Sequence, residues 1–296
     1  MRTWIASALA AVACTYQIPQ DNEWRNESVS GSGDGWSFTQ AEISRQLSVD
    51  AYCGHNQYMT HDFYGYATGF IPTYTIYHSV NDVEGFIGYL PSDDSIYVVF
   101  KGSDSIRNWV SNLNTDKDKY RAFPECKCRV HDGFQNVTES VQDEVVEHVS
   151  FLMTVYPTAQ IKTTGHSLGA AIAQLMAMAL EANGIHVDQV LNFGQPRVGD
   201  KDYANFTDNM ITNQWRHTHH KDIVPHVPPS DWPFSFHQQS TEVFEHPDET
   251  YKICGPGEDK NCSDQYLLFG LEDHLHYMGQ CMGDFCGNCK SSDTLV

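Results

Sequence analysis

Basic residues are scarce in this chain, and it has no long apolar run. Lysine and arginine together number 18, against 38 aspartates and glutamates, which gives a formal net charge of −20 over 296 residues. Because the sequence contains no basic block, we do not expect it to bind nucleic acid. Anionic membranes should also repel such a surface, so neutral lipid or small neutral substrates are favoured. No apolar stretch reaches the roughly 18 residues of a membrane-spanning helix, so we expect no transmembrane anchor.

The N-terminus, the cysteines and the glycosylation sequons together predict a secreted protein. Residues 1–13 carry one arginine, an apolar run over 4–12 and an Ala-Val-Ala cut site at 11–13, which is typical of a signal peptide. The alternative is an apolar N-terminal helix of the mature fold. Nine cysteines are present, and removal of Cys14 with or near the signal leaves eight, a number that can pair completely. The sequons fit a secretory route and lie at Asn26, Asn136, Asn205 and Asn261.

Composition divides the chain into four segments. After the predicted signal at 1–13, residues 14–36 are polar, acidic and rich in glycine and serine, which predicts a disordered segment or pro-segment. Residues 37–281 carry the regular helix and strand patterns, and residues 282–296 form a tail that contains cysteines. Because we find no internal repeat and no linker, we expect one α/β domain and a monomer.

Strand patterns alternate with helix patterns, which predicts parallel pairing with covered sheet faces. A capping-box pattern at 39–42 predicts a helix that continues to residue 51. Three β-rich runs separated by turn residues predict an antiparallel meander at 73–78, 85–90 and 95–100. Further along, the pattern predicts a helix at 134–156, a strand at 159–164, a helix at 170–182, strands at 190–193 and 214–219, and a hairpin at 241–244 and 249–253.

The pentapeptide GHSLG at 165–169 lies between the predicted strand at 159–164 and the predicted helix at 170–182. A serine in a sharp strand-to-helix turn, with glycine two residues away on each side, is typical of a nucleophile elbow. A bare G-x-S-x-G motif also arises by chance in roughly one chain in ten of this length. The flanking strand and helix favour the functional interpretation, with Ser167 as the nucleophile and the N–H of Leu168 as an oxyanion donor.

A serine nucleophile needs a histidine base and an acid that orients it, and in this arrangement both follow the serine in the chain. Asp222 is the first candidate for the acid, since it follows the strand at 214–219 and begins a proline-rich loop. Asp200 and Asp248 are the alternatives. His274 near the C-terminus is the candidate base, and His276 is its nearest rival.

Five blocks of sequence lie in order along the chain: FKGSDSIRNW at 100–109, VHDGF at 130–134, GHSLG at 165–169, KDIVP at 221–225 and DHLHY at 273–277. In order and spacing they resemble the fungal-type, or class 3, triacylglycerol lipases over roughly residues 49–281. The resemblance implies an α/β-hydrolase fold, in which a central mixed, mostly parallel sheet has helices on both faces and a short helical lid. It also implies a secreted esterase that acts on acylglycerols at a lipid–water interface.

The resemblance assigns a role to each candidate residue. It implies that Ser167 is the nucleophile, Asp222 the acid and His274 the base. Ser103, which follows the strand at 95–100, resembles the second oxyanion donor beside Leu168. No cofactor is implied.

Residues 106–113 have apolar side chains at the spacing of one helix face, which predicts a two-turn amphipathic helix. The plain interpretation is a helix packed on the core. Similarity to the family lid favours a movable cover that exposes its apolar face at a lipid surface. The predicted lid comprises Ile106, Arg107, Asn108, Trp109, Val110, Ser111, Asn112 and Leu113.

Four disulfides are expected. Cys53–Cys281 and Cys254–Cys262 resemble family disulfides, and the family often has a short cysteine pair at the position of Cys126 and Cys128. Cys286 and Cys289 would then pair in the tail. The histidines at 217, 219 and 220 could suggest a metal cluster, but no carboxylate or cysteine has an obvious ligand spacing to them, so we expect no metal.

Three functions remain open from the sequence. The first is a secreted triacylglycerol lipase. The second is a related esterase on the same fold, either a feruloyl-type esterase or a phospholipase A1. The third is a non-catalytic binding protein, which the intact set of Ser167, Asp222 and His274 disfavours. The apolar face at 106–113 favours the lipase over an esterase for carbohydrate-linked esters.

Overall fold

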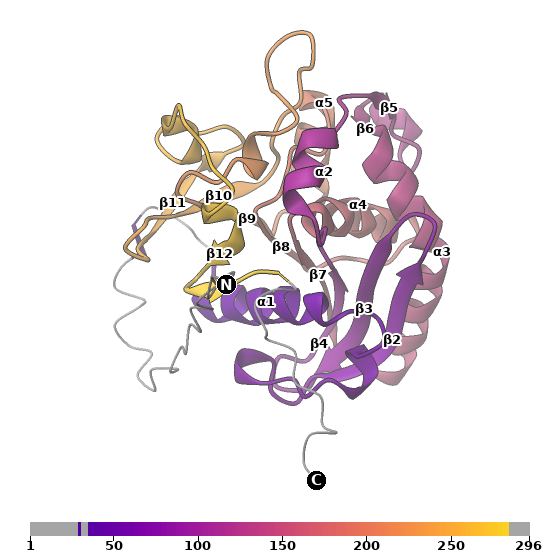
Figure 1. Ribbon diagram of the computed structural model, residues 1–296. Coiled ribbons are helices and arrows are strands. Elements are labelled where there is room, and N and C mark those ends of the chain that lie inside the picture. Colours follow the sequence, from indigo (N-terminus) through magenta and orange to yellow (C-terminus); the bar gives the residue numbers. More distant parts are fainter. Residues whose placement is uncertain (1–28, 31–34, 284–296) are drawn as a thin grey trace, which may run out of the picture.

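The computed structural model describes residues 29–30 and 35–283, and a nine-stranded sheet forms its centre (Figure 1). The strand order is β1-β11-β10-β9-β8-β7-β4-β3-β2. The five middle strands run parallel, while β2 and β3 form an antiparallel meander with β4 and β11 runs antiparallel to β10. The bounds are β1 (Val29–Ser30), β2 (Ile71–His78), β3 (Val83–Leu90), β4 (Ser95–Phe100), β7 (Gln160–His166), β8 (Gln189–Phe193), β9 (Gln214–His219), β10 (Thr241–Glu245) and β11 (Tyr251–Pro256).

Helices cover both faces of the sheet, as predicted. α3 (Asp132–Val155) and α4 (Leu168–Ala182) pack on one face, and α1 (Phe38–Asp50) packs on the other (Figure 1). Side chains alternate along β4: Val98 belongs to the core with α3 and α4, whereas Tyr97 and Val99 belong to the core with α1. Burial on both faces explains why β4 is a continuous apolar run and not an alternating one.

Short elements surround this centre. β5 (Lys117–Lys119) pairs with β6 (Arg129–His131), and β12 (His276–Tyr277) pairs with β13 (Gln280–Cys281). α2 (Ile106–Asn112) lies at the upper end of the molecule as drawn in Figure 1. α5 (Lys201–Met210) was not predicted, although Asp200 caps it by accepting a hydrogen bond from the Tyr203 N–H at 2.9 Å.

The predicted start of the first helix needs correction. The N-cap of α1 is Ser37 and not Thr39, two residues earlier than predicted, because the Ser37 hydroxyl accepts from the Gln40 N–H, while Thr39 lies inside the helix. The segment at 14–36, expected to be disordered or a pro-segment, makes two contacts with the domain: Val29–Ser30 pairs with β11, and the Trp36 indole donates to His217 Nε2 at 3.2 Å. The predicted signal and Asn26 lie outside the described residues.

Disulfides join Cys126 to Cys128 and Cys254 to Cys262. Cys53 and Cys281 are also disulfide-bonded, and their pairing with each other stays a prediction. Cys286 and Cys289 lie outside the described residues. The three described sequon asparagines, at 136, 205 and 261, are exposed. Within residues 29–30 and 35–283, no helix combines the length and the apolar character needed to cross a membrane.

Candidate active site

Ser167 occupies the turn between β7 and α4 in a strained backbone conformation. Its φ is +60° and its ψ is −128°, values that a residue other than glycine rarely adopts. The neighbouring glycines leave room for this turn. A Cβ at Gly165 would lie 2.5 Å from the Gly169 carbonyl carbon, and one at Gly169 would lie 2.3 Å from the Phe100 carbonyl oxygen. Neither position can carry a side chain, which is the geometry of a nucleophile elbow.

The structure brings Asp222 and His274 into direct contact. The His274 Nδ1 lies 2.7 Å from Asp222 Oδ2, and both side chains are buried. Because a carboxylate can only accept, Nδ1 carries the proton and Nε2 has a free lone pair. Among the described residues, neither His274 Nε2 nor the buried Ser167 hydroxyl has a hydrogen-bond partner. Both atoms are therefore available to a substrate or to each other.

Asp222 is held by bonds to both of its oxygens. Oδ1 accepts from the Val224 N–H at 2.7 Å, and Oδ2 also accepts from the Tyr277 hydroxyl at 2.5 Å. Burial, followed by the charge of Asp222, raises the pKa of Tyr277 well above its ordinary value, so the phenol stays protonated and donates. Gly194 leaves space for the imidazole, since a Cβ there would lie 2.7 Å from His274 Cε1.

His166, the variable residue of the elbow, supports the backbone of His274. Its Nε2 lies 2.9 Å from the His274 carbonyl oxygen, and the two imidazole rings stack at 4.4 Å between centroids. A carbonyl cannot donate, so Nε2 carries the proton and Nδ1 accepts from the Tyr52 hydroxyl at 2.6 Å. Burial, with the nearby His274, lowers the pKa of His166 well below its ordinary value and keeps it neutral. Neither Tyr52 nor this role of His166 was predicted from the sequence.

The two candidate oxyanion donors lie on either side of the elbow. Leu168 is the first residue of α4, immediately after Ser167. Ser103 follows Gly102, where an added Cβ would come within 3.2 Å of the Ser167 Cβ and 2.2 Å of the Tyr52 hydroxyl. The end of β4 thus approaches the serine closely enough that only glycine fits there.

Comparison with known proteins shows the family of the chain. The model of the family described as lipase (class 3) matches residues 97–232. A complex of the Rhizomucor miehei lipase with its propeptide has a TM-score of 0.76 and 30% identity, covering 82% of this chain and 79% of that chain. This chain belongs to the class 3 lipase family.

Two more comparisons show how far the similarity extends. The Rhizomucor miehei lipase sequence is 34% identical over 206 residues, which is 68% of this chain and 56% of that protein. A solved triacylglycerol lipase with a serine protease triad as its catalytic centre is 29% identical with a TM-score of 0.76, covering 83% of this chain and 96% of that chain. This chain spans little more than half of the length of the Rhizomucor and Rhizopus sequences that it matches.

The predicted lid of this member of the class 3 lipase family forms a helix that ends one residue earlier than expected, at Asn112. Leu113 has an extended backbone and caps the helix. The apolar face points inward: Ile106 is buried, and the Trp109 ring stacks on Phe134 at 6.3 Å. His131 holds the segment after α2, because its Nε2 bonds the Asn114 carbonyl at 3.1 Å while its Nδ1 accepts from the Phe134 N–H.

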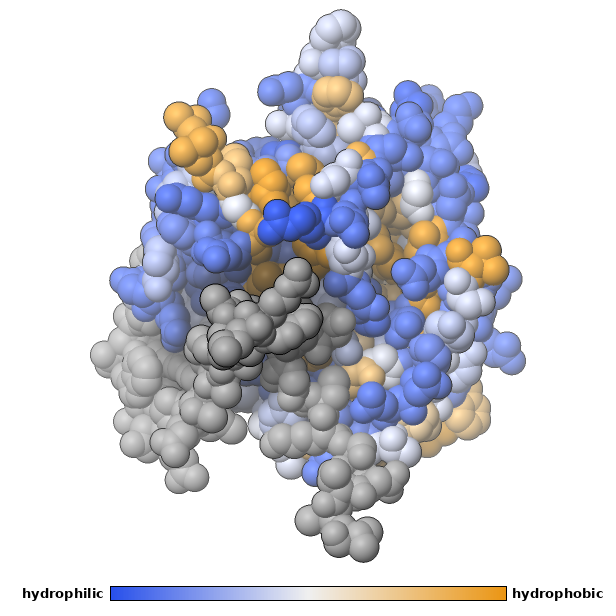
Figure 2. Space-filling view, in the orientation of Figure 1, coloured by the Kyte–Doolittle hydropathy of each residue, from blue (hydrophilic) through white to orange (hydrophobic). Residues whose placement is uncertain are grey.

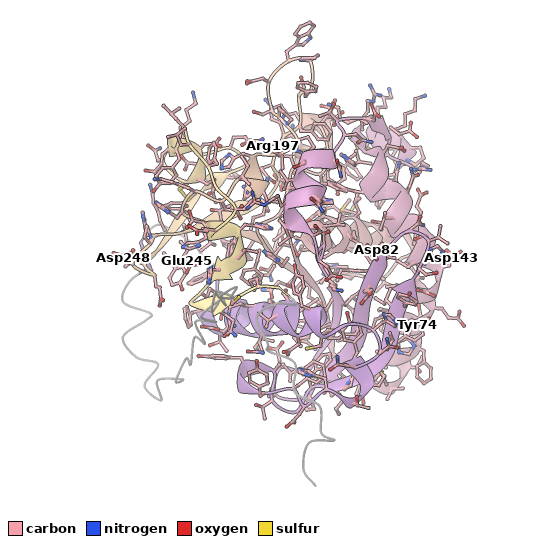
Figure 3. All side chains as sticks on the ribbon, viewed as in Figure 1. Tyr74, Asp82, Asp143, Arg197, Glu245 and Asp248 are labelled. Carbon is pink, nitrogen blue, oxygen red and sulfur yellow. A yellow bond between two sulfur atoms is a disulfide. The ribbon has the colours of Figure 1, made fainter. Side chains whose placement is uncertain are left out.

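The rival candidates have other contacts. Asp200 caps α5, and Asp248 is exposed and accepts from Thr250 at the outer side of the molecule (Figure 3). His276 is exposed, with its Nδ1 bonded to the Glu272 carbonyl.

The three histidines considered as a metal cluster bond separate groups. His217 receives the Trp36 indole N–H, and burial lowers the pKa of His217 to about 3. His219 Nδ1 bonds the Asp273 carbonyl, and His220 Nδ1 bonds the Asp273 carboxylate. Glu242 lies near two cysteine sulfurs, but those sulfurs are joined in the Cys254–Cys262 disulfide and are not thiolate ligands.

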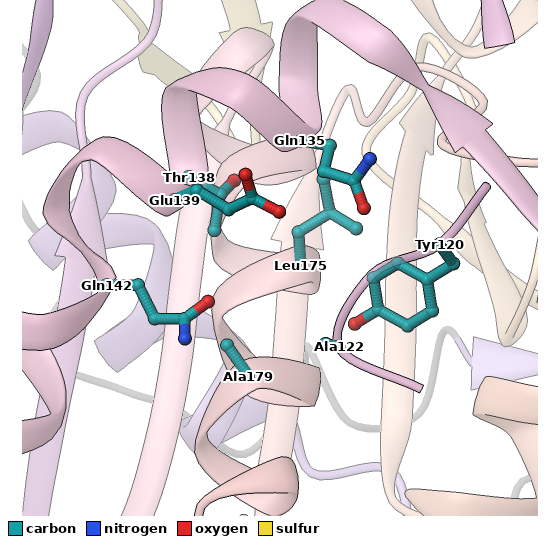
Figure 4. A pocket seen from close by; sticks show the side chains of 8 residues that line it. All are labelled: Tyr120, Ala122, Gln135, Thr138, Glu139, Gln142, Leu175 and Ala179. Carbon is teal, nitrogen blue, oxygen red and sulfur yellow. The ribbon is translucent and has the colours of Figure 1, made fainter. Parts of the chain in front are cut away.

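One small crevice lies apart from these residues, between α3, α4 and residues 120–122 (Figure 4). The Tyr120 hydroxyl in it is buried and, among the described residues, has no hydrogen-bond partner. No candidate catalytic residue contributes to its lining, which consists of Tyr120, Ala122, Gln135, Thr138, Glu139, Gln142, Leu175 and Ala179.

Proposed function

We propose that this chain is a secreted triacylglycerol lipase, a serine hydrolase that cleaves acylglycerol esters through an acyl-enzyme at a lipid–water interface. The observation that supports this most directly is the buried Asp222–His274 hydrogen bond, with the His274 ring stacked on His166, the residue before the strained Ser167. Named relatives support the substrate class, since they include lipases of Rhizomucor miehei and a secreted mono- and diacylglycerol lipase of Fusarium solani. The two disulfides support secretion.

In the proposed reaction, His274 Nε2 takes the proton of the Ser167 hydroxyl as the oxygen attacks the ester carbonyl carbon. The carbonyl electron pair moves to oxygen, and the N–H groups of Ser103 and Leu168 stabilise that oxyanion. His274 then gives the proton to the leaving glycerol oxygen, which leaves an acyl-serine. Water repeats the sequence and releases the fatty acid. Asp222 keeps the imidazole in the required tautomer and stabilises the imidazolium.

The proposed lid is α2. Its inward apolar face closes the site in water, and a lipid surface would favour an open position in which Trp109 and its neighbours contact lipid. The apolar face of α2 favours a lipid substrate over an ester linked to carbohydrate.

A substrate panel tests the proposed function. Purified protein would be assayed on p-nitrophenyl esters of several chain lengths, a triglyceride, a phospholipid and a feruloyl ester, each beside Ser167→Ala. We expect triglyceride turnover that Ser167→Ala abolishes. Turnover that survives the substitution would contradict the nucleophile assignment, and turnover of the feruloyl ester or the phospholipid in preference to the triglyceride would contradict the substrate class.

A further inference from the structure

Two loops carry large apolar side chains that project into solvent. The Trp232 loop comprises residues 229–236 and the Leu267 loop comprises residues 265–270. Trp232 is 89% exposed, Leu267 is 93% exposed and Leu268 is 81% exposed. Burial of such side chains is ordinarily favourable, and adjacent exposed leucines often mark an interaction site.

Both loops are attached to the end of the sheet that carries the candidate active site. Gly270 at the end of the Leu267 loop pairs with Asp222, since the Ile223 N–H donates to the Gly270 carbonyl at 3.1 Å. The Trp232 loop is held by Lys117, which follows the lid segment: its Nζ donates to the Phe234 and Ser235 carbonyls and lies 4.6 Å from the Phe236 ring centroid. The two loops therefore lie near the proposed entrance for substrate.

The surface of these loops is apolar and nearly uncharged. Asp231 is the one charged residue in the two loops, in a chain whose formal net charge is −20. In Figure 2 the projection at the upper left is strongly hydrophobic, while the loop at the top is mostly of intermediate hydropathy with one hydrophobic group. The Trp232 loop rises above the rest of the ribbon in Figure 1.

We propose that these two loops dock the protein on a neutral, zwitterionic lipid surface before the lid opens. In the closed state the lid has its apolar face packed inward, with Trp109 against Phe134, so the lid cannot make the first contact. The loops expose Trp232, Leu267 and Leu268 in that same state. The inference rests on the proposed lipase function, and it separates docking, which these loops perform, from lid opening, which gives access to Ser167.

Vesicle binding of the full chain tests the proposal. All proteins would carry Ser167→Ala so that the lipid stays intact, and binding to phosphatidylcholine vesicles would be measured by flotation. We expect Leu267→Ser with Leu268→Ser to weaken binding at least tenfold, Trp232→Ser to weaken it severalfold, and salt to have little effect. Vesicles with anionic lipid should bind more weakly at low salt, because the protein is strongly acidic.

A matched control lies at the C-terminal end of α3, the end opposite to Phe134. Phe151 is 57% exposed and Val155 is 48% exposed, and both lie near the far end of a helix roughly 36 Å long at ~1.5 Å per residue. Phe151→Ser with Val155→Ser should leave vesicle binding unchanged. Trp109→Ala should weaken vesicle binding less than the leucine pair does, because the lid contacts lipid only after the loops have docked. Thermal unfolding confirms that every variant is folded.

Three results would overturn the docking proposal. The first is vesicle binding that the loop variants leave intact. The second is an equal loss in the Phe151/Val155 control or in Trp109→Ala, which would assign docking to general surface apolarity or to the lid. The third is a lipid-free dimer that the leucine variants dissociate while vesicle binding persists. Hydrolysis of a soluble ester by the protein with Ser167 intact is measured separately, so a failure of the proposed function is distinguished from a failure of docking.

Discussion

Replacing Tyr52 with phenylalanine removes one oxygen atom from the support of the proposed base. That hydroxyl donates to His166 Nδ1 at 2.6 Å, and His166 in turn donates to the His274 carbonyl at 2.9 Å. All three side chains are buried. Loss of the donor leaves a buried nitrogen lone pair unsatisfied, which costs about 1–3 kcal/mol. A loss of ~1.4 kcal/mol in the transition state lowers kcat about tenfold.

Tyr58 provides the matched control for this substitution. Tyr58 is also buried and lies six residues after Tyr52, and its hydroxyl donates to the Ala51 carbonyl at 2.6 Å. Tyr58→Phe should lower the free energy of unfolding by a similar ~1–3 kcal/mol and leave kcat unchanged. Tyr52→Phe should lower both, with KM within about twofold of the wild type.

Steady-state kinetics on a soluble ester, together with urea unfolding of both variants, measure these effects. Equal loss of kcat in the two tyrosine variants, or full kcat in Tyr52→Phe, would show that the contact with His166 stabilises the fold without positioning the base.

Three further perturbations address the acid, the lid and a buried carboxyl. Asp222→Asn should lower kcat by roughly 10³–10⁴-fold, while Asp200→Asn, which keeps an N-cap, should leave it unchanged. Trp109→Ala should weaken the jump in activity on an emulsified ester above its solubility limit, and a flat wild-type rate across that limit would remove the lid argument. Burial raises the pKa of Glu245 to about 8, so unfolding between pH 4.5 and 8 releases the proton of this carboxyl. The free energy of unfolding of the wild type, relative to that of Glu245→Gln, should therefore fall by at most about 1.4 kcal/mol per pH unit over this range. Urea unfolding at several pH values would measure this slope.

Local sequence patterns predicted several strands of the central sheet. β4 and β9 begin and end as predicted, because each is a compact β-rich run bounded by turn residues. The antiparallel pairing of β10 with β11 was also predicted. The start of α1 was misplaced, because Ser37 and Thr39 are both acceptable caps and tertiary packing of Phe38 decides between them.

The supporting contacts of the site could not be predicted in the same way. The Tyr52–His166 bond joins residues 114 positions apart, and the bond from His166 to the His274 carbonyl spans 108 positions. No periodicity or spacing encodes such contacts, because they depend on how α1 and the end of β4 pack beside β7. Gly102 offered part of the signal for Tyr52. A Cβ at Gly102 would lie 2.2 Å from the Tyr52 hydroxyl, so only glycine fits there.

Two of the sequence blocks, KDIVP at 221–225 and DHLHY at 273–277, contact each other in the structure. The spacing of residues inside each block therefore matters more than the number of residues between the blocks. Lys221 and Asp222 contact the second block at separate points: the Lys221 N–H donates to the Asp273 carboxylate at 3.1 Å, and Asp222 accepts from both His274 and Tyr277. A one-residue insertion within either block would break at least one of these contacts. An insertion in the exposed Leu267 loop between the blocks would leave them intact, as long as Gly270 still pairs with Asp222. The position of His274 is therefore set by contacts between the two blocks. The chain between them can serve another function, such as the proposed lipid docking.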